Sequence, residues 1–285
     1  MIEPWMDRAC ARAEETFAKN GVKLTLGGEP TYVPVHPEGA EWSYAAVGPT
    51  KLAFAWKVAA ALQKGRMAGA AAFFCPGKSY PGEVNPRWVV KLISNRDGKP
   101  LFLRPRGRAP GPQALQHLAD AISKNLGVPS HWLALENPLH PRSETLATPL
   151  DHDGAIWRSA RWPLEKKSRK LSEAEGPAGL RLPLHLLPPG LPRRALTLER
   201  TGDTLAIFFP PLLQKPFLDL LAAVEQAGKK LALAHIDLQG YVAPDEGNRW
   251  TTLGLAADPG VLEINLPACT SWRDYAAWLD AVTAA

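Results

Sequence analysis

The stretch LTLGGEPTY, Leu24–Tyr32, places an acidic side chain just after a short apolar strand. Two glycines follow the strand, and Pro30 prevents the backbone around Glu29 from continuing as a helix. A strand end that delivers an acid into a glycine-lined turn is a common position for a metal ligand or a catalytic base. An ordinary turn explains the same residues equally well. Whether this stretch indicates a functional site therefore depends on the rest of the chain.

Several further motifs follow this stretch along the chain. Each combines glycine or proline with charged or aromatic side chains, which is typical of loops that carry a binding site. In chain order they are Glu41-Trp42, AAVGPTK (Ala45–Lys51), PGKSYPGE (Pro76–Glu83), Pro86-Arg87-Trp88 and DPGVLEIN (Asp258–Asn265).

Taken in this order, the motifs resemble the amidoligase domain found behind bacterial transglutaminase-like domains, a branch of the glutamine-synthetase-like carboxylate–amine ligases. The resemblance extends over nearly the whole chain. It implies a strand-rich α+β fold, the use of ATP and a divalent metal such as magnesium, and the joining of a carboxylate to an amine. The expected substrate is an anionic small molecule, an amino acid or a peptide.

The chain also departs from the family pattern. Gly77-Lys78 is followed by Ser79 where the family usually has tryptophan, and the segment Glu263–Asn265 is followed by leucine where the family usually has histidine. The chain stops at Ala285, before a glycine-rich segment with asparagine and histidine that the family carries further on. We therefore expect the front part of the ligase domain, with the remaining ligase half or a transglutaminase-like domain on a separate chain as a partner.

The composition is that of a globular protein. The 285 residues are 46% hydrophobic and 21% charged, which allows a buried core and excludes a disordered chain. No apolar run approaches the ~18 residues that span a bilayer, and no signal peptide is evident. Cys10, Cys75 and Cys269 are widely separated and odd in number, which indicates a reducing compartment. We therefore expect a cytoplasmic protein without membrane contact.

The charge balance favours an anionic partner over a nucleic acid. The net charge is +5, and the densest basic run lies between Arg158 and Lys170. A solvated loop surface is the simplest explanation for that run, and a nucleotide phosphate or an acidic peptide is the alternative. No zinc-finger, helix-turn-helix or aromatic ribonucleoprotein motif supports a nucleic-acid partner, which we set aside.

Hydrophobic periodicity predicts helices that alternate with short strands. Helices are expected over 4–20, 49–64, 112–127, 217–224 and 272–282, the last one capped by Ser271. Strands are expected over 22–26, 70–74, 194–199, 205–209, 231–234, 250–255 and 261–266, with a hairpin that pairs 89–93 with 101–103. Hairpins favour antiparallel pairing, and each helix needs a sheet face to bury its apolar stripe. We therefore expect an α+β fold with mainly antiparallel sheets covered by helices.

Residues 136–193 differ from the rest of the chain. Prolines recur, charges cluster and periodicity is poor, and one short hairpin is expected around Asp153-Gly154. We interpret this region as an irregular insertion within a single domain over residues 1–285, rather than as a linker between independent domains.

Three acids are candidates for a magnesium site. Glu29, Glu199 and Glu263 each follow an apolar strand segment, so their carboxylates can reach a sheet edge, and magnesium prefers such oxygen ligands. Glu29 and Glu263 match the family pattern best and are expected to share one ion, and Glu29 is also a candidate catalytic residue. A solvated acid at a strand end is the alternative, and it applies most strongly to Glu199, which precedes Arg200 and a tight turn.

Lys78, Glu83 and Arg181 are candidates for contacts with ATP and substrate. Glycines around Lys78 let the backbone approach a phosphate while the lysine supplies charge, although the spacing is not that of a Walker A loop. Arg181 carries a guanidinium fork that suits a phosphate or a carboxylate. We expect Lys78 and Arg181 to face one cleft, with Glu83 as a catalytic residue. A structural ion pair is the alternative for either cation.

Nucleophilic catalysis has little support in the sequence. Cys75 follows Phe73-Phe74, which favours a buried, inert thiol over a transglutaminase nucleophile. The histidines lack metal-binding spacing, and His235 is expected to be a packed strand residue. Two functions remain open: the front part of an ATP-dependent amidoligase, and a non-catalytic nucleotide- or peptide-binding or assembly module that keeps the fold.

Overall fold

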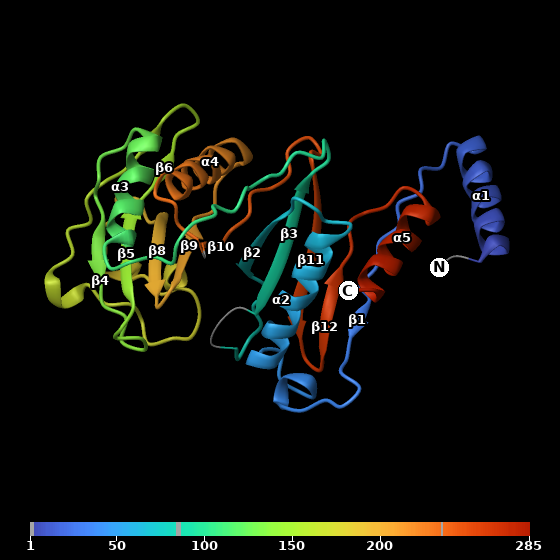
Figure 1. Cartoon of the computed structure of the whole chain (residues 1–285), viewed down its shortest axis with the longest axis horizontal. Coiled ribbons are helices and arrows are strands. Elements are labelled where there is room, and N and C mark those ends of the chain that lie inside the picture. The colour runs from blue at the N-terminus through green and yellow to red at the C-terminus, as the bar shows by residue number, and fades with distance from the viewer. Residues whose placement is uncertain (1–2, 84–86, 235) are drawn as a thin grey trace. The chain divides into compact units, whose positions relative to one another are not determined.

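The computed structural model describes residues 3–83, 87–234 and 236–285 (Figure 1). The expected strand residue His235 and the motif residue Pro86 lie outside them. The chain is an α+β protein whose strands pair mainly in the antiparallel sense. It divides into two compact units: unit 1 comprises Met1–Ala72, Arg87–Leu101 and Arg249–Ala285, and unit 2 comprises Phe73–Pro86 and Phe102–Asn248.

Unit 1 contains an antiparallel sheet with the strand order β1-β12-β11-β3. Its strands are β1 (Thr31–Tyr32), β3 (Trp88–Asn95), β11 (Trp250–Asp258) and β12 (Val261–Asn265). Its helices are α1 (Pro4–Lys19), the short η1 (Ala40–Trp42), α2 (Pro49–Lys64) and α5 (Trp272–Thr283). Helix α2 lies across β3 and β11 (Figure 1).

Alternating side chains give this sheet a face of buried aliphatic residues. They include Val90, Leu92, Leu253, Leu255, Leu262 and Ile264. Ile93 and Trp250, which are also buried, lie on the opposite face at the far end of β3 and β11. Leu255 pairs with Val90 on one side and with Ile264 on the other. Because opposite residues of an antiparallel pair point to the same face, these side chains share one face, and α2 buries its own apolar residues against it.

Unit 2 contains a mixed sheet with the strand order β2-β10-β9-β8-β5-β4, in which β10 runs parallel to β2 and β9. Its strands are β2 (Ala71–Pro76), β4 (Leu133–Leu135), β5 (Glu144–Pro149), β8 (Ala195–Thr201), β9 (Thr204–Phe209) and β10 (Ile236–Gly240). Helices α3 (Ala114–Leu126) and α4 (Gln214–Lys230) pack against each other. The rings of Phe73, Phe209 and Phe217 contact one another in the core.

Residues 136–193 contain more regular structure than their sequence indicates. Strand β5 lies in this range and pairs with both β4 and β8. The expected hairpin forms between β6 (Asp151–His152) and β7 (Trp157–Arg158). Three short helices follow: η2 (Lys166–Ser168), η3 (Ala178–Leu180) and η4 (Leu184–Leu186). Trp162, Leu164 and Leu171 pack with Leu135 and Ala147 of the sheet, so this segment completes part of the hydrophobic core.

Three local predictions are wrong. Residues 101–103 are not a strand, because Leu101 donates its N–H to Gly69 and neighbouring prolines remove ladder donors, while β3 pairs with β11. In the stretch 22–26 only Leu26 makes a strand-type pairing, with Cys269. Of residues 231–234, which follow the end of α4, only Leu233 makes a strand-type pairing, with Arg108, and it comes after a turn where Ala232 has a φ of 49°. No helix in the described part of the chain is long and apolar enough to cross a membrane.

Candidate functional site

The Gly-Gly-Glu-Pro stretch runs beside β12 in unit 1 (Figure 1). Three contacts define the register: Ile264 N–H donates to Pro30 O at 2.8 Å, Leu266 N–H donates to Gly28 O at 3.1 Å, and Thr31 pairs with Glu263. This register places Glu29 opposite Asn265, which is two residues beyond Glu263. Glu29 and Glu263 therefore occupy diagonal positions on neighbouring segments of one sheet, although more than two hundred residues separate them in sequence.

These carboxylates lie on the sheet face opposite to the leucines. On β11 and β3 the same face carries Lys91, Gly254 and Ala256, because Gly254 pairs with both Asn265 and Lys91, and Ala256 pairs with Glu263 on one side and with the apolar Val89 on the other. We call the following seven residues the polar face: Glu29, Thr31, Lys91, Gly254, Ala256, Glu263 and Asn265. Glu29 and Thr31 are exposed, whereas Lys91 and Asn265 are partly buried.

Helix α5 fixes the edge segment that carries Glu29. A Cβ atom at Gly28 would lie 2.6 Å from the hydroxyl of Tyr275, so only glycine allows this close approach. The hydroxyl of Tyr32 donates to the carbonyl of Val282 in α5. Burial raises the pKa of Tyr32 above its ordinary value, which keeps this donor protonated. The backbone on both sides of Glu29 is thus held against the helix.

The carboxylate of Glu263 is buried and oriented. Its side chain is only 8% exposed, and its Oε1 accepts a hydrogen bond from Asn265 Nδ2 at 2.8 Å. In a regular ladder, diagonal positions such as those of Glu29 and Glu263 are about 7–8 Å apart. The described residues contain no group of three or more His, Cys, Asp or Glu side chains that could hold a metal. A two-carboxylate site suits magnesium, which usually keeps several waters.

Glu41 caps the N-terminus of α2. Its Oε1 accepts hydrogen bonds from the Thr50 hydroxyl at 2.7 Å and from the Thr50 N–H at 3.2 Å. These bonds, the hydroxyl first, hold the pKa of Glu41 below its ordinary value. A Cβ atom at Gly48 would collide with this carboxylate, which explains the glycine. The motifs around Glu41 and Gly48 therefore build a helix start rather than a reactive centre.

Lys51, in the first turn of α2, holds the turn between β11 and β12. Its side chain is fully buried, and its Nζ donates to Ala46 O at 2.9 Å and to Asp258 O at 2.6 Å. Its Nζ also lies 5.1 Å from the ring centroid of Trp42. Burial lowers the pKa of Lys51 to about 8. The side chain of Asp258 pairs with Arg87, so the turn that leads into β12 is fixed from two sides.

Arg181 and Glu199 belong to one hydrogen-bond network in unit 2. Glu199 Oε1 accepts from Asn137 Nδ2 at 2.7 Å, from Ser143 Oγ at 3.2 Å and from Thr145 Oγ1 at 3.4 Å. Arg181 is only 2% exposed and donates to Asn137 Oδ1 and to Ser172 O, both at 2.9 Å. The network links the loop 137–143 to strand β8 and to the segment that carries Arg181.

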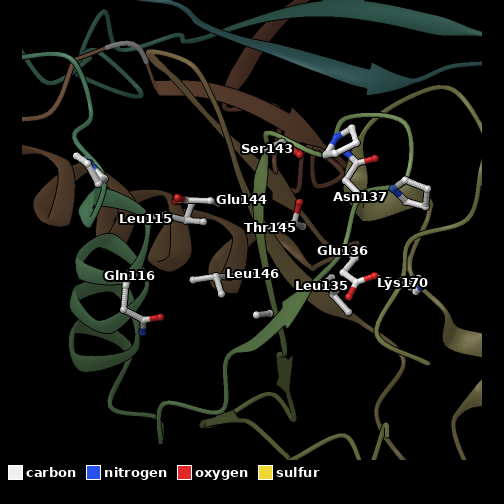
Figure 2. Close-up of a pocket in the computed structure, with 14 residues that line it drawn as sticks. Leu115, Gln116, Leu135, Glu136, Asn137, Ser143, Glu144, Thr145, Leu146 and Lys170 are labelled. Atoms are coloured by element: carbon white, nitrogen blue, oxygen red, sulfur yellow. Dashed lines mark ion pairs between the residues drawn. The ribbon is translucent and has the colours of Figure 1, made fainter. Parts of the chain in front are cut away.

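A cavity of about 700 Å³ lies beside this network (Figure 2). Leu115 and Leu146 supply apolar lining, whereas Asn137, Ser143 and Thr145 supply polar lining and also donate to Glu199. These polar groups are already satisfied by hydrogen bonds within the protein. The network therefore shapes the wall of the cavity.

Lys78 and Glu83 lie in the loop that follows β2, and both side chains are exposed. Cys75, just before this loop, is buried, as expected from its sequence. The candidate residues are thus found in three places: Glu29 and Glu263 on the polar face of unit 1, and Lys78 with Glu83 in a loop of unit 2. Arg181 and Glu199 share the network described above.

Sequence reasoning missed Lys51, Lys91 and Asn265. The signal for Lys91 was available in Val89-Val90-Lys91-Leu92, where lysine interrupts an apolar strand at a position that alternates with buried residues. What the sequence lacks is the identity of the partner strand, which decides what lies beside Lys91. Lys51 has the helical spacing of a buried position, because Ala55 and Val58 are buried on the same helix.

A comparison with protein families identifies the family of the chain. A family model described as "Putative amidoligase enzyme (DUF2126)" matches residues 4–149 and 188–285. The match includes the whole polar face, whereas Arg181 lies in the unmatched segment 150–187. No curated protein and no solved structure matches the chain. Because the match covers well over half of the sequence, the chain belongs to the family that this model describes as putative amidoligase enzymes.

Proposed function

We propose that this protein takes part in the ATP-dependent joining of a carboxylate to an amine, and that its polar face holds the magnesium ion. Membership of the amidoligase-type family supports a ligase. The observation that carries the proposal for the site is the diagonal placement of Glu29 and Glu263 on one sheet face, with Glu263 buried and oriented by Asn265.

The chemistry requires two transfers. An oxygen of the substrate carboxylate attacks the γ-phosphorus of ATP, and ADP leaves. The amine nitrogen then attacks the acyl carbon, phosphate leaves, and the amine gives up a proton. Magnesium, when bound, neutralises phosphate charge. Glu263 is the fixed ligand in this scheme, and the exposed Glu29 is the second ligand or the acceptor of the amine proton.

Glu29→Gln and Glu263→Gln are each expected to weaken magnesium binding by roughly tenfold, because each removes one of two anionic oxygen ligands. Titration calorimetry of magnesium into the wild type and both variants measures this effect. Glu175→Gln is the matched control, since Glu175 is an exposed acid of unit 2. Equal weak binding by all four proteins would remove the metal role.

Amine-dependent release of ADP tests the reaction itself. The assay supplies ATP, magnesium, and mixtures of amino acids and glutamate-rich peptides as acids and amines. Turnover that depends on the amine and is lost in Glu263→Gln would support the ligase. Nucleotide binding without amine-dependent turnover would favour the non-catalytic binding module.

Lys78→Ala is expected to weaken nucleotide binding by roughly tenfold through loss of one charged contact. Lys78 is exposed in a loop, so the free energy of unfolding is expected to change by less than ~1 kcal/mol. Fluorescence titration with a labelled ATP analogue and urea unfolding measure the two quantities. Unchanged affinity in the variant would exclude Lys78 from the nucleotide site.

A further inference from the structure

Lys91 is a partly buried cation with no hydrogen bond or ion pair among the described residues of this structure. Its strand neighbours Val90 and Leu92 are fully buried on the other face of the sheet. A cation that is partly removed from water loses solvation, and a protein usually offsets that loss with an anionic partner. The polar face thus contains a positive charge with no partner among the described residues, and an anionic ligand would supply one.

A glycine separates Lys91 from the acidic side of the polar face. Lys91 pairs with Gly254, and Gly254 pairs with Asn265, so the three residues form one row across β3, β11 and β12. At about 4.8 Å per strand, the backbones of Lys91 and Asn265 are about 10 Å apart. Gly254 places no side chain in this interval. A Cβ atom there would lie 3.3 Å from Val89 Cγ2 and 3.4 Å from Asn265 Cβ, so these two side chains flank the buried backbone of Gly254 closely.

We propose that Lys91 and the floor at Gly254 form a subsite for a phosphoryl group. A tetrahedral phosphate has several anionic oxygens, so it can face the ammonium of Lys91 on one side and a cation held by Glu263 on the other. Glu263 is diagonal to Gly254 in the same ladder, because it pairs with Ala256. The position of the subsite beside the magnesium ligands rests on the proposed function, whereas the attraction between Lys91 and an anion does not.

The first test measures phosphate binding without metal. Titration calorimetry or phosphorus NMR with inorganic phosphate, ADP and ATP in the presence of EDTA compares the wild type with Lys91→Met. We expect Lys91→Met to lower the affinity for inorganic phosphate and for ATP by roughly tenfold, and Lys91→Arg to retain most of that affinity. Lys57→Met is the matched control, because Lys57 is an exposed lysine of unit 1 on α2, which covers the other face of the sheet.

The second test fills the space above Gly254 with a side chain and leaves Lys91 unchanged. Gly254→Val puts a branched side chain over the row and is expected to reduce phosphate affinity as strongly as Lys91→Met. Gly254→Ala is expected to have a smaller effect, since its Cβ needs a shift of only a few tenths of an ångström. Circular dichroism confirms folding of each variant before titration, and Lys91→Met provides the answer if Gly254→Val does not fold.

The outcomes separate this subsite from the magnesium site. If Lys91→Met lowers the affinity for ATP more than the affinity for ADP, the γ-phosphate occupies the subsite. If the affinities for inorganic phosphate, ADP and ATP fall equally, the subsite accepts any terminal phosphoryl group. Unchanged binding of inorganic phosphate, ADP and ATP in Lys91→Met overturns the proposal. If Lys91→Met weakens phosphate in EDTA while Glu263→Gln leaves magnesium binding unchanged, the subsite stands and the proposed metal role fails.

Discussion

Arg181→Ala is expected to lower the free energy of unfolding of unit 2 by about 3 kcal/mol. The guanidinium is buried, and it donates to Asn137 Oδ1 and Ser172 O, both at 2.9 Å. Its removal leaves a cavity and takes a charged donor from each of two acceptors, and hydrogen bonds that involve a charged group contribute about 1.5–3 kcal/mol each. Asn137 would then hold Glu199 less firmly, because the same amide bridges both side chains.

Arg181→Lys tests whether the planar guanidinium or only its positive charge stabilises unit 2. A lysine keeps the charge but cannot reproduce the planar fork, so we expect a loss of stability close to that of the alanine variant. Arg142→Ala is the control, because Arg142 is an exposed arginine in the same unit. Urea unfolding and hydrogen exchange of β8 and the loop 137–143 measure the effect. If the variants have normal stability but bind nucleotide more weakly, Arg181 binds phosphate, as its sequence context suggested.

Arg181 shows why the chemistry of a residue could be read from the sequence but its surroundings could not. The stretch Gly179-Leu180-Arg181-Leu182 contains a glycine and precedes a proline, which is typical of an exposed turn. In the structure, the partner of Arg181 is Asn137, 44 residues earlier in the chain. Burial at this position depends on packing of the segment 136–193 over the sheet, which has no periodic signal in the sequence.

Helices were predicted better than strand partners for a similar reason. Helices α2, α3, α4 and α5 are present over the predicted segments, and Ser271 caps α5 by accepting a hydrogen bond from the Asp274 N–H. Helical hydrogen bonds are local, so periodicity and end signals identify them. The partner of β3 is β11, more than 150 residues away, whereas the sequence favoured a local hairpin with 101–103. Non-local pairing leaves no comparable trace in a single sequence.

The site was predicted in part because strand ends have a recognisable chemistry. The sequence suggested that Glu29 and Glu263 belong to one site, and the register places them on neighbouring segments of one sheet face. Their role as magnesium ligands remains a prediction. Glu199 was selected by the same strand-end argument, yet its carboxylate accepts three hydrogen bonds from residues of unit 2. An acid that follows an apolar segment can be recognised in the sequence, but the sheet that its strand joins depends on non-local pairing.

Lys51→Met is expected to lower the stability of unit 1 by about 2 kcal/mol and to change how that stability depends on pH. Methionine keeps most of the volume but leaves the carbonyl oxygens of Ala46 and Asp258 without their donor, and an unsatisfied buried acceptor costs about 1–3 kcal/mol. The turn between β11 and β12 would be held less firmly. Since that turn leads into the strand of Glu263, we expect magnesium binding to weaken as well.

The direction of the pH effect follows from the lowered pKa of Lys51, which is about 8 in the folded protein against an ordinary value of 10.5. Between these values the unfolded chain binds more protons at this residue than the folded chain, so the contribution of Lys51 to stability rises as the pH increases. The neutral amine still has two N–H groups, enough to donate to both carbonyls. The stability difference between wild type and Lys51→Met should therefore be smallest near pH 7 and grow between about pH 8 and pH 10. Urea unfolding at pH 7, 8, 9 and 10, with Lys57→Met as the control, measures it, and a difference that stays constant or shrinks with pH would show that Lys51 is buried without a lowered pKa.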